Sequence, residues 1–288
     1  MKILNSFCCT LIVALAVVSC STDGDNGLSD KDSFTYKYEE SNVPIKSCTA
    51  VRSENSFVIT GSSENGQVFA IGFNKFGNLA QADSYSISDF DFPSSTSFEY
   101  YKSNYFNFEL VGLDESKKRV SVKFSGNLYE DGYDLNSTDH YVEGDFTLGY
   151  LEVVPQLSGL EVSAKIGGEP WYSTDSDLSA TGYSGGWIVS LNEFNDGEYM
   201  ISYVIDPQNT VVGSYDFDEN ALVNKIDFFR YDPNTNEFIE YQTAGTFNIT
   251  QKNDGFITHI IGEFNLTASN GSESIVITEG VINDVYSF

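Results

Sequence analysis

Basic residues are scarce in this chain of 288 residues. Lysine and arginine together number 15, against 42 aspartates and glutamates, and the formal net charge at pH 7 is −27. Proteins that bind nucleic acid use clustered lysine and arginine to displace phosphate counterions, and anionic membrane surfaces attract the same side chains. The composition therefore excludes nucleic acid as a partner, and charge does not draw the folded body to anionic lipid.

Cysteine and histidine are also rare. Three of the four cysteines, Cys8, Cys9 and Cys20, lie near the N-terminus, which leaves Cys48 with no disulfide partner in the rest of the chain. A catalytic thiol or a histidine-based metal site would have to use His140 or His259, the only two histidines. The fold must therefore be stabilised by hydrophobic cores.

The apolar run at the N-terminus is short. It extends from Phe7 to Val18, follows Lys2 and is followed by the small residue Ser19. A helix that crosses a bilayer needs about 20 apolar residues, whereas a basic start, a shorter apolar run and a small residue are typical of a cleaved signal peptide. We therefore predict that residues 1–19 are a signal peptide.

The four residues Val17-Val18-Ser19-Cys20 resemble the bacterial lipobox, in which the cysteine is acylated through its sulfur and becomes the mature N-terminus. The resemblance implies that Cys20 is lipidated and that the lipid bilayer is a partner, because several acyl chains anchor a protein stably. The alternative is an ordinary signal peptide that happens to contain a cysteine.

Acidic residues follow Cys20 at once, at Asp23 and Asp25. This stretch resembles the export signal of Bacteroidetes-type surface lipoproteins, which implies an outer-membrane location facing the cell exterior; the periplasmic leaflet is the alternative. Residues 20–33 are otherwise rich in Ser, Asp, Gly and Asn, a composition typical of a disordered segment. We interpret them as the lipidated cysteine and a flexible tether.

Most of the remaining chain alternates between apolar and polar residues, which is the pattern of half-buried β-strands. The clearest segments are 56–62, 67–73, 104–113, 118–128, 186–191, 198–205 and 273–282. Short stretches rich in Asn, Asp and Gly, at 64–67, 233–236, 251–255 and 269–272, predict hairpin turns. The fold class is therefore all-β.

A shift of 136 residues superimposes several glycines of the two halves. It places Gly61 on Gly197, Gly126 on Gly262, and Gly144 on Gly280. Glycine inside a strand marks a bulge or a close backbone approach, and such a feature outlasts side-chain drift. We predict two related antiparallel β-sandwich or barrel-like domains in tandem, at residues 34–155 and 158–288.

The second half resembles a family of uncharacterised small all-β lipoproteins. The matching features are Trp171, Gly213-Ser214-Tyr215, and the segments IIGEFNLTA (260–268) and IVITEGVI (275–282), which follow the patterns IxGxFxxxA and VxITxGxF. The family has no established activity. The resemblance therefore implies an all-β lipoprotein and no particular chemistry.

One motif invites a catalytic interpretation. Residues 182–186 read Gly-Tyr-Ser-Gly-Gly and satisfy the G-x-S-x-G pattern of a nucleophile elbow. That elbow needs a helix after the serine, and here the strand-like WIVSL follows. We predict a glycine-rich hairpin or loop, no catalytic residue and a protein that is not an enzyme.

Asp232, Asn234 and Asn236 have the spacing of the first half of a calcium-binding loop. Glu237 stands where that loop needs glycine, and Thr243 stands where it needs glutamate. We therefore predict a polar turn, with a weak structural calcium site as the alternative. No other cofactor is predicted.

Aromatic residues make up 15% of the chain. Exposed Tyr and Trp stack on the apolar faces of sugars, and four aromatics near predicted loops are candidate ligand-binding residues: Trp171, Tyr172, Tyr183 and Trp187. Packing in the core is the alternative role. The functional hypothesis is a cell-surface lipoprotein that binds an extracellular glycan or an envelope protein; the alternative is a structural or accessory envelope lipoprotein with no small-molecule ligand.

Overall fold

The computed structural model describes residues 31–89, 92–253, 255 and 257–287. The predicted signal peptide, Cys20 and most of the predicted tether lie outside this range. The described residues form β-strands and one 3₁₀ turn, η1 (Lys102–Asn104), and they contain no helix that is long and apolar enough to cross a membrane. The all-β fold predicted from the alternating pattern is confirmed.

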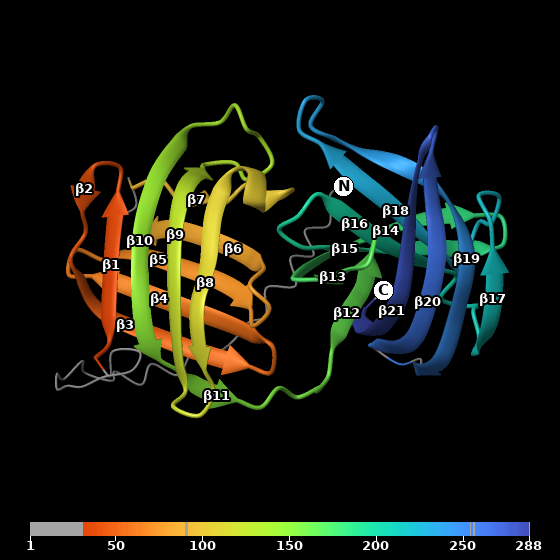
Figure 1. Ribbon diagram of the computed structural model, residues 1–288, viewed down its shortest axis with the longest axis horizontal. Coiled ribbons are helices and arrows are strands. Elements are labelled where there is room, and N and C mark those ends of the chain that lie inside the picture. Colours follow the sequence, from red (N-terminus) through yellow and green to blue (C-terminus); the bar gives the residue numbers. More distant parts are fainter. Residues whose placement is uncertain (1–30, 90–91, 254, 256, 288) are drawn as a thin grey trace. The chain divides into compact units, whose positions relative to one another are not determined.

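The chain divides after Ser158 into two compact units. In the N-terminal unit the strands form one 11-stranded sheet, in the order β11-β3-β4-β5-β6-β7-β9-β10-β1-β2 with β8 paired to β9. The strands are β1 (Ser33–Tyr38), β2 (Ser41–Asn42), β3 (Ile45–Ser53), β4 (Ser56–Ser63), β5 (Gln67–Asn74), β6 (Leu79–Ser86), β7 (Ser95–Thr96), β8 (Phe106–Asp114), β9 (Arg119–Tyr129), β10 (Asp139–Gly149) and β11 (Leu151–Val153). Figure 1 shows this sheet curled so that β1, β10, β9 and β8 lie in front of β3 to β6.

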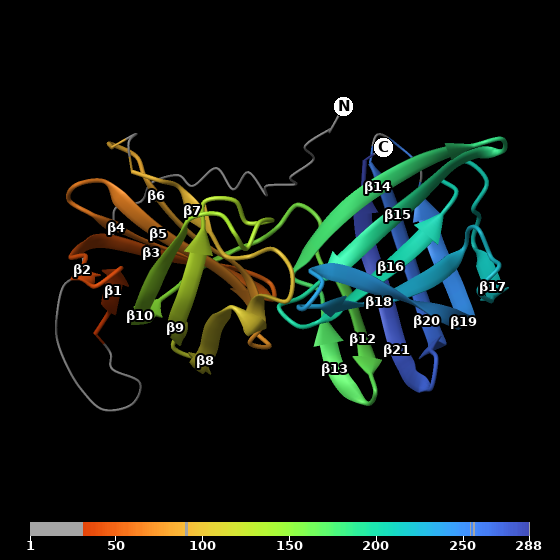
Figure 2. The same ribbon diagram turned by 90° about the horizontal axis from the view of Figure 1, so that it is seen from above.

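The C-terminal unit is a 10-stranded sheet in the order β13-β12-β21-β20-β19-β18-β16-β15-β14, with β17 paired to β19. The strands are β12 (Glu161–Ile166), β13 (Glu169–Tyr172), β14 (Asp175–Tyr183), β15 (Gly186–Phe194), β16 (Tyr199–Ile205), β17 (Gly213–Phe217), β18 (Lys225–Asp232), β19 (Glu237–Asn253), β20 (Thr258–Asn270) and β21 (Glu273–Tyr286). This sheet also curls on itself, as Figure 2 shows. The predicted sandwich or barrel-like architecture is therefore present in both units.

The two units share a strand order. In each, the first strand lies beside the strand that ends an antiparallel meander, β1 next to β10 and β12 next to β21. The N-terminal unit adds the short strand β11, which pairs in parallel with β3. One glycine match is not equivalent, because Gly61 lies in β4 whereas Gly197 lies between β15 and β16. The other two are equivalent: Gly126 and Gly262 lie in β9 and β20, and Gly144 and Gly280 lie opposite a buried phenylalanine in β10 and β21. The units are therefore related in topology, and the shift of 136 residues matches glycines correctly in the last two strands of this meander but not at Gly61.

Aromatic rings fill the core of the N-terminal unit. The ring of Phe69 stacks on Tyr36 at 4.8 Å and on Phe124 at 4.4 Å between centroids, and all three side chains are buried. Gly144 lies opposite Phe124 on the neighbouring strand, and it leaves room for the ring because it has no side chain. Strand glycines in this fold thus make space for the aromatic residues across from them.

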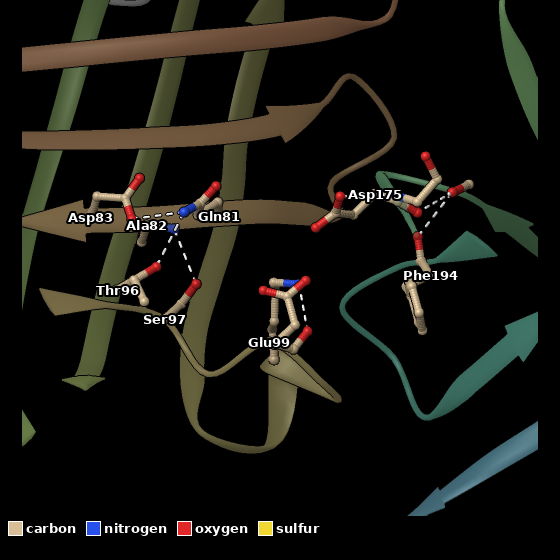
Figure 3. A network of polar contacts seen from close by, with 11 residues as sticks. Gln81, Ala82, Asp83, Thr96, Ser97, Glu99, Asp175 and Phe194 are labelled. Carbon is tan, nitrogen blue, oxygen red and sulfur yellow. Dashed lines mark hydrogen bonds and ion pairs between the residues drawn. The ribbon is translucent and has the colours of Figure 1, made fainter. Parts of the chain in front are cut away.

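A polar network fixes the segment after β7 to β6 (Figure 3). The backbone N–H of Ala82 donates to Ser97 Oγ at 3.1 Å, and the N–H of Ser97 donates to the carbonyl of Ala82 at 2.7 Å. The amide of Gln81 donates to Asp83 Oδ1 at 2.8 Å and to Thr96 Oγ1 at 3.2 Å. The bonds between Ala82 and Ser97 satisfy buried polar groups beside the shortest strand of this part of the sheet, the two-residue β7.

Candidate functional site

The motif at residues 182–186 forms the tip of the β14–β15 hairpin. The two strands pair in unbroken register from Asp175 opposite Phe194 to Tyr183 opposite Gly186, so Ser184 and Gly185 make the turn. A strand follows the serine, as predicted from WIVSL. The tip is therefore a hairpin turn and lacks the strand-to-helix geometry of a nucleophile elbow.

Trp187 continues a buried row of side chains out into solvent. Alternate residues of a strand share a face, and the row Leu191, Val189 and Trp187 runs along β15 from the core to the tip. Leu191 and Val189 are buried, whereas Trp187 is 44% exposed. Gly182 lies opposite Trp187, and a Cβ at that position would lie 3.6 Å from the indole ring. Because it is a glycine, this cross-strand neighbour adds no side chain over the indole ring.

Tyr183 fixes the hairpin tip from the other face. Its hydroxyl donates to Asp206 Oδ2 at 2.6 Å, and the side chain as a whole is 38% exposed. This hydrogen bond to a carboxylate raises the pKa of Tyr183, with smaller contributions from burial and from the charge of Asp206. The tip is thus tied to the segment that follows β16.

Asp206 organises that segment. It is 1% exposed, and its carboxylate accepts hydrogen bonds from Asn209 Nδ2 at 2.8 Å and from the backbone N–H groups of Gln208 and Asn209 at 2.9 and 3.1 Å. Burial works to raise the pKa of Asp206, but the hydrogen bonds from Asn209, Tyr183 and the backbone lower it below its ordinary value. An ionised Asp206 therefore holds the loop in one conformation.

A second link reaches the segment before β18. Thr210 Oγ1 accepts from the N–H of Asp206 at 3.0 Å and donates to Asn224 Oδ1 at 2.5 Å. Residues 182–187, 206–212 and 220–224 thus form one connected group of loops. We call its exposed side chains the Trp187 surface: Tyr183, Trp187, Gln208, Asn209, Val211, Val212 and Leu222.

The Trp187 surface combines apolar and amide side chains. Val211, Val212 and Leu222 are 63%, 55% and 68% exposed. The exposed residues Gln208 and Asn209 carry amides, and that of Gln208 lies near Gly186 on the Tyr183 face of the tip. The tip therefore offers an aromatic ring on one face and amides for hydroxyl groups on the other.

Trp171 and Tyr172 do not belong to this surface. Trp171 is 4% exposed and packs in the core of the C-terminal unit, on the same side of β13 as its partner Ala164 on β12. The prediction that Trp171 contacts a ligand was therefore wrong, because its strand turns that side chain inward. Tyr172 is half-buried on β13 and is not part of the β14–β15 tip.

Asp232, Asn234 and Asn236 form the turn between β18 and β19. Asp232 Oδ1 accepts from the backbone N–H and from Nδ2 of Asn234, both at 2.9 Å, and these bonds lower the pKa of Asp232. Asn236 has a φ of 57° and accepts from the Tyr231 hydroxyl at 3.2 Å. The predicted polar turn is present, and its oxygens are used within it. In the part of the chain that is described, no three His, Cys, Asp or Glu side chains gather as metal ligands.

Two features of the site were missed at the sequence level. The segment from Asp206 to Asn209 begins Asp-Pro, a pair typical of turn initiation, and this signal could have identified the loop. Glu193 was missed for another reason: it is one of 42 acidic residues, and only the fold shows that it is 4% exposed.

No protein-family model matches the chain, and comparison with curated proteins and with solved structures also finds no match.

Proposed function

We propose that this protein is a lipid-anchored lipoprotein of the outer cell surface that binds an extracellular glycan, without catalysis, through the Trp187 surface. The observation that carries the proposal is the position of Trp187, 44% exposed at the end of a buried row and on a hairpin tip that is tied down from its opposite face. An indole held in this way offers a rigid platform.

The composition of the surface favours a sugar. Aromatic faces stack on the C–H faces of pyranose rings, and the amides of Gln208 and Asn209 suit sugar hydroxyls. Because the Tyr183–Asp206 bond orders the tip in the free protein, binding needs little further ordering. An envelope protein is the competing ligand, since Val211, Val212 and Leu222 all expose apolar side chains, and protein contacts use such side chains where they cluster.

Replacing Trp187 with alanine should weaken glycan binding by about 10- to 30-fold, because an aromatic contact at the centre of a site contributes about 1.4–2 kcal/mol. The acylated protein in detergent would be screened on a glycan array, and the affinity for the strongest sugar measured by calorimetry. The melting temperature should not change. Phe76→Ala is the matched control, since Phe76 is 41% exposed at a turn of the N-terminal unit.

An array that is silent for the wild-type protein would contradict a glycan ligand and leave the envelope-protein or structural role. Equal affinities for Trp187→Ala and Phe76→Ala would show that sugars bind elsewhere. These two outcomes are distinguishable, because the first concerns the ligand class and the second only the site.

The lipobox-like residues Val17 to Cys20 support the anchor. The net charge of −27 would be repelled by anionic lipid, so attachment to the membrane would depend on the acyl chains at Cys20. Cys20→Ala should therefore move the protein from the membrane pellet to the soluble fraction after cell lysis, because no acyl chain can then be attached. Ser19→Ala keeps the thiol and serves as the control. Retention of the Cys20→Ala protein in the membrane would contradict lipid anchoring.

A further inference from the structure

Glu193 is a buried acid whose hydrogen bonding is incomplete. It lies in β15, is 4% exposed, and forms no ion pair with the described residues. Its Oε2 lies 2.7 Å from Ser173 Oγ, while Oε1 is buried and has no hydrogen-bond partner. A carboxylate in this setting would be a desolvated charge with one donor, which is costly.

Ser173 is surrounded by more acceptors than it can serve. Besides Glu193, its Oγ lies 3.0 Å from the carbonyl oxygen of Asp175 and 3.1 Å from that of Phe194, two residues shown in Figure 3. A serine hydroxyl has a single hydrogen to donate. A second hydrogen, carried by Glu193, would let Ser173 accept from Glu193 and donate to a backbone carbonyl.

Other titratable groups face this site from four strands. The charges of Asp284 in β21 and of Asp175 at the start of β14 both raise the pKa of Glu193. The hydroxyl of Tyr203 in β16 donates to Asp284 Oδ2 at 2.5 Å. The charge of His259 in β20 lowers the pKa of Asp284. Tyr286, also in β21, raises the pKa of Tyr203 through its charge.

The proton belongs on Glu193. Burial raises the pKa of Glu193 well above its ordinary value, and the charge of Asp284 raises it further against the effect of the Ser173 hydrogen bond. Burial also raises the pKa of Asp284, but Tyr203 and the N–H of Val285 both donate to that carboxylate. Of the two acids, Asp284 is therefore the better stabilised as an anion.

We propose that Glu193 and Ser173 form a proton-operated latch at the corner between β13 and β14. With its proton, Glu193 donates to Ser173 Oγ, and Ser173 donates to the carbonyl of Phe194 or Asp175. The corner is then held on the end of β15, where Thr174 N–H also donates to the Phe194 carbonyl at 2.8 Å. When the proton passes to water, the uncompensated charge draws solvent in and the corner opens.

The sign of the pH effect follows from the protonated native state. In the unfolded chain a glutamate has a pKa of about 4.3 and is ionised above that pH. In the folded protein Glu193 still holds its proton at these pH values, because its pKa is raised. The contribution to stability is therefore complete below the unfolded-state pKa and is lost as pH rises toward the raised pKa of the folded state. This inference does not depend on the proposed glycan function.

Hydrogen exchange on the full chain would test the latch. Peptides that cover residues 170–176 and 190–196 would be followed at pH 6 and pH 9, with rates corrected for intrinsic exchange. In the wild-type protein their protection should fall by about tenfold or more at pH 9. In the Glu193→Gln protein the protection of these peptides should stay the same at pH 6 and pH 9, because an amide cannot ionise. Glu237→Gln, at an exposed acid of β19, should behave as the wild type.

Equal pH dependence in the wild type and Glu193→Gln would overturn the proposal. If Glu193→Gln does not fold, infrared spectroscopy of the wild-type protein decides the question. A protonated carboxylic acid stretch should be present at pH 7 and should disappear with the loss of protection at the β13–β14 corner. A folded wild-type protein with no such band at pH 7 would equally overturn it.

Discussion

Replacing Gly144 with alanine is expected to lower the free energy of unfolding of the N-terminal unit by about 3 kcal/mol, the upper end of the cost of overpacking a core. A Cβ at this position would lie 2.2 Å from the backbone oxygen of Thr35 in β1 and 2.7 Å from the ring of Phe124 in β9. Because the first contact is with backbone, no change of rotamer relieves it, and β1 must move away from β10.

Gly72→Ala is the matched control. Gly72 also lies in the interior of a strand, β5, but a Cβ there would have its closest contact 3.7 Å away, at Ala80. We expect a change within about 1 kcal/mol, since alanine also restricts the unfolded chain. The measurement is urea unfolding followed by far-UV circular dichroism. Both tryptophans, Trp171 and Trp187, lie in the C-terminal unit and report on it separately by fluorescence. Equal losses for Gly144→Ala and Gly72→Ala would contradict the steric argument.

The strands could be predicted from the sequence because period-two alternation and Asn-Gly or Asp-Gly turns act locally. The role of Gly144 could not, because its crowding comes from Thr35 and Phe124, which are distant along the chain. The shift of 136 residues pairs Gly144 with Gly280, which leaves room for the ring of Phe264 in the same way. It also pairs Gly61 with Gly197, which lies between two strands.

The candidate site was predicted in part. Trp171 and Trp187 each precede or begin a strand-like run, and nothing local in the sequence shows which of them faces inward. The fold decides: β13 turns Trp171 into the core, whereas Trp187 lies past the last buried residue of its row, Val189. Tyr183 was predicted with Trp187, but its partner Asp206 was not, because the pairing joins a hairpin tip to a loop beyond the next strand.

Asp206→Ala is expected to lower the free energy of unfolding of the C-terminal unit by about 3 kcal/mol, because a hydrogen bond to a charged group contributes about 1.5–3 kcal/mol and this carboxylate accepts several. The Tyr183 hydroxyl, the Asn209 amide and two backbone N–H groups would lose their acceptor. The tip would then be free to move, so glycan affinity should fall together with stability. Tryptophan fluorescence during urea unfolding and calorimetric titration with the array-selected sugar would measure the two effects.

Tyr183→Phe separates the two effects, because it removes one donor and leaves the loop that Asp206 holds intact. Its stability should fall by only about 1 kcal/mol, the net value of one hydrogen bond.

In the wild type, the stabilisation from Asp206 is present above the ordinary aspartate pKa, about 3.9, and is lost as pH falls through the lowered pKa of the folded state. Asp206→Ala should lack this acid-dependent loss. An Asp206→Ala protein with wild-type stability and undiminished sugar binding would show that the Trp187 surface does not depend on the Asp206 carboxylate.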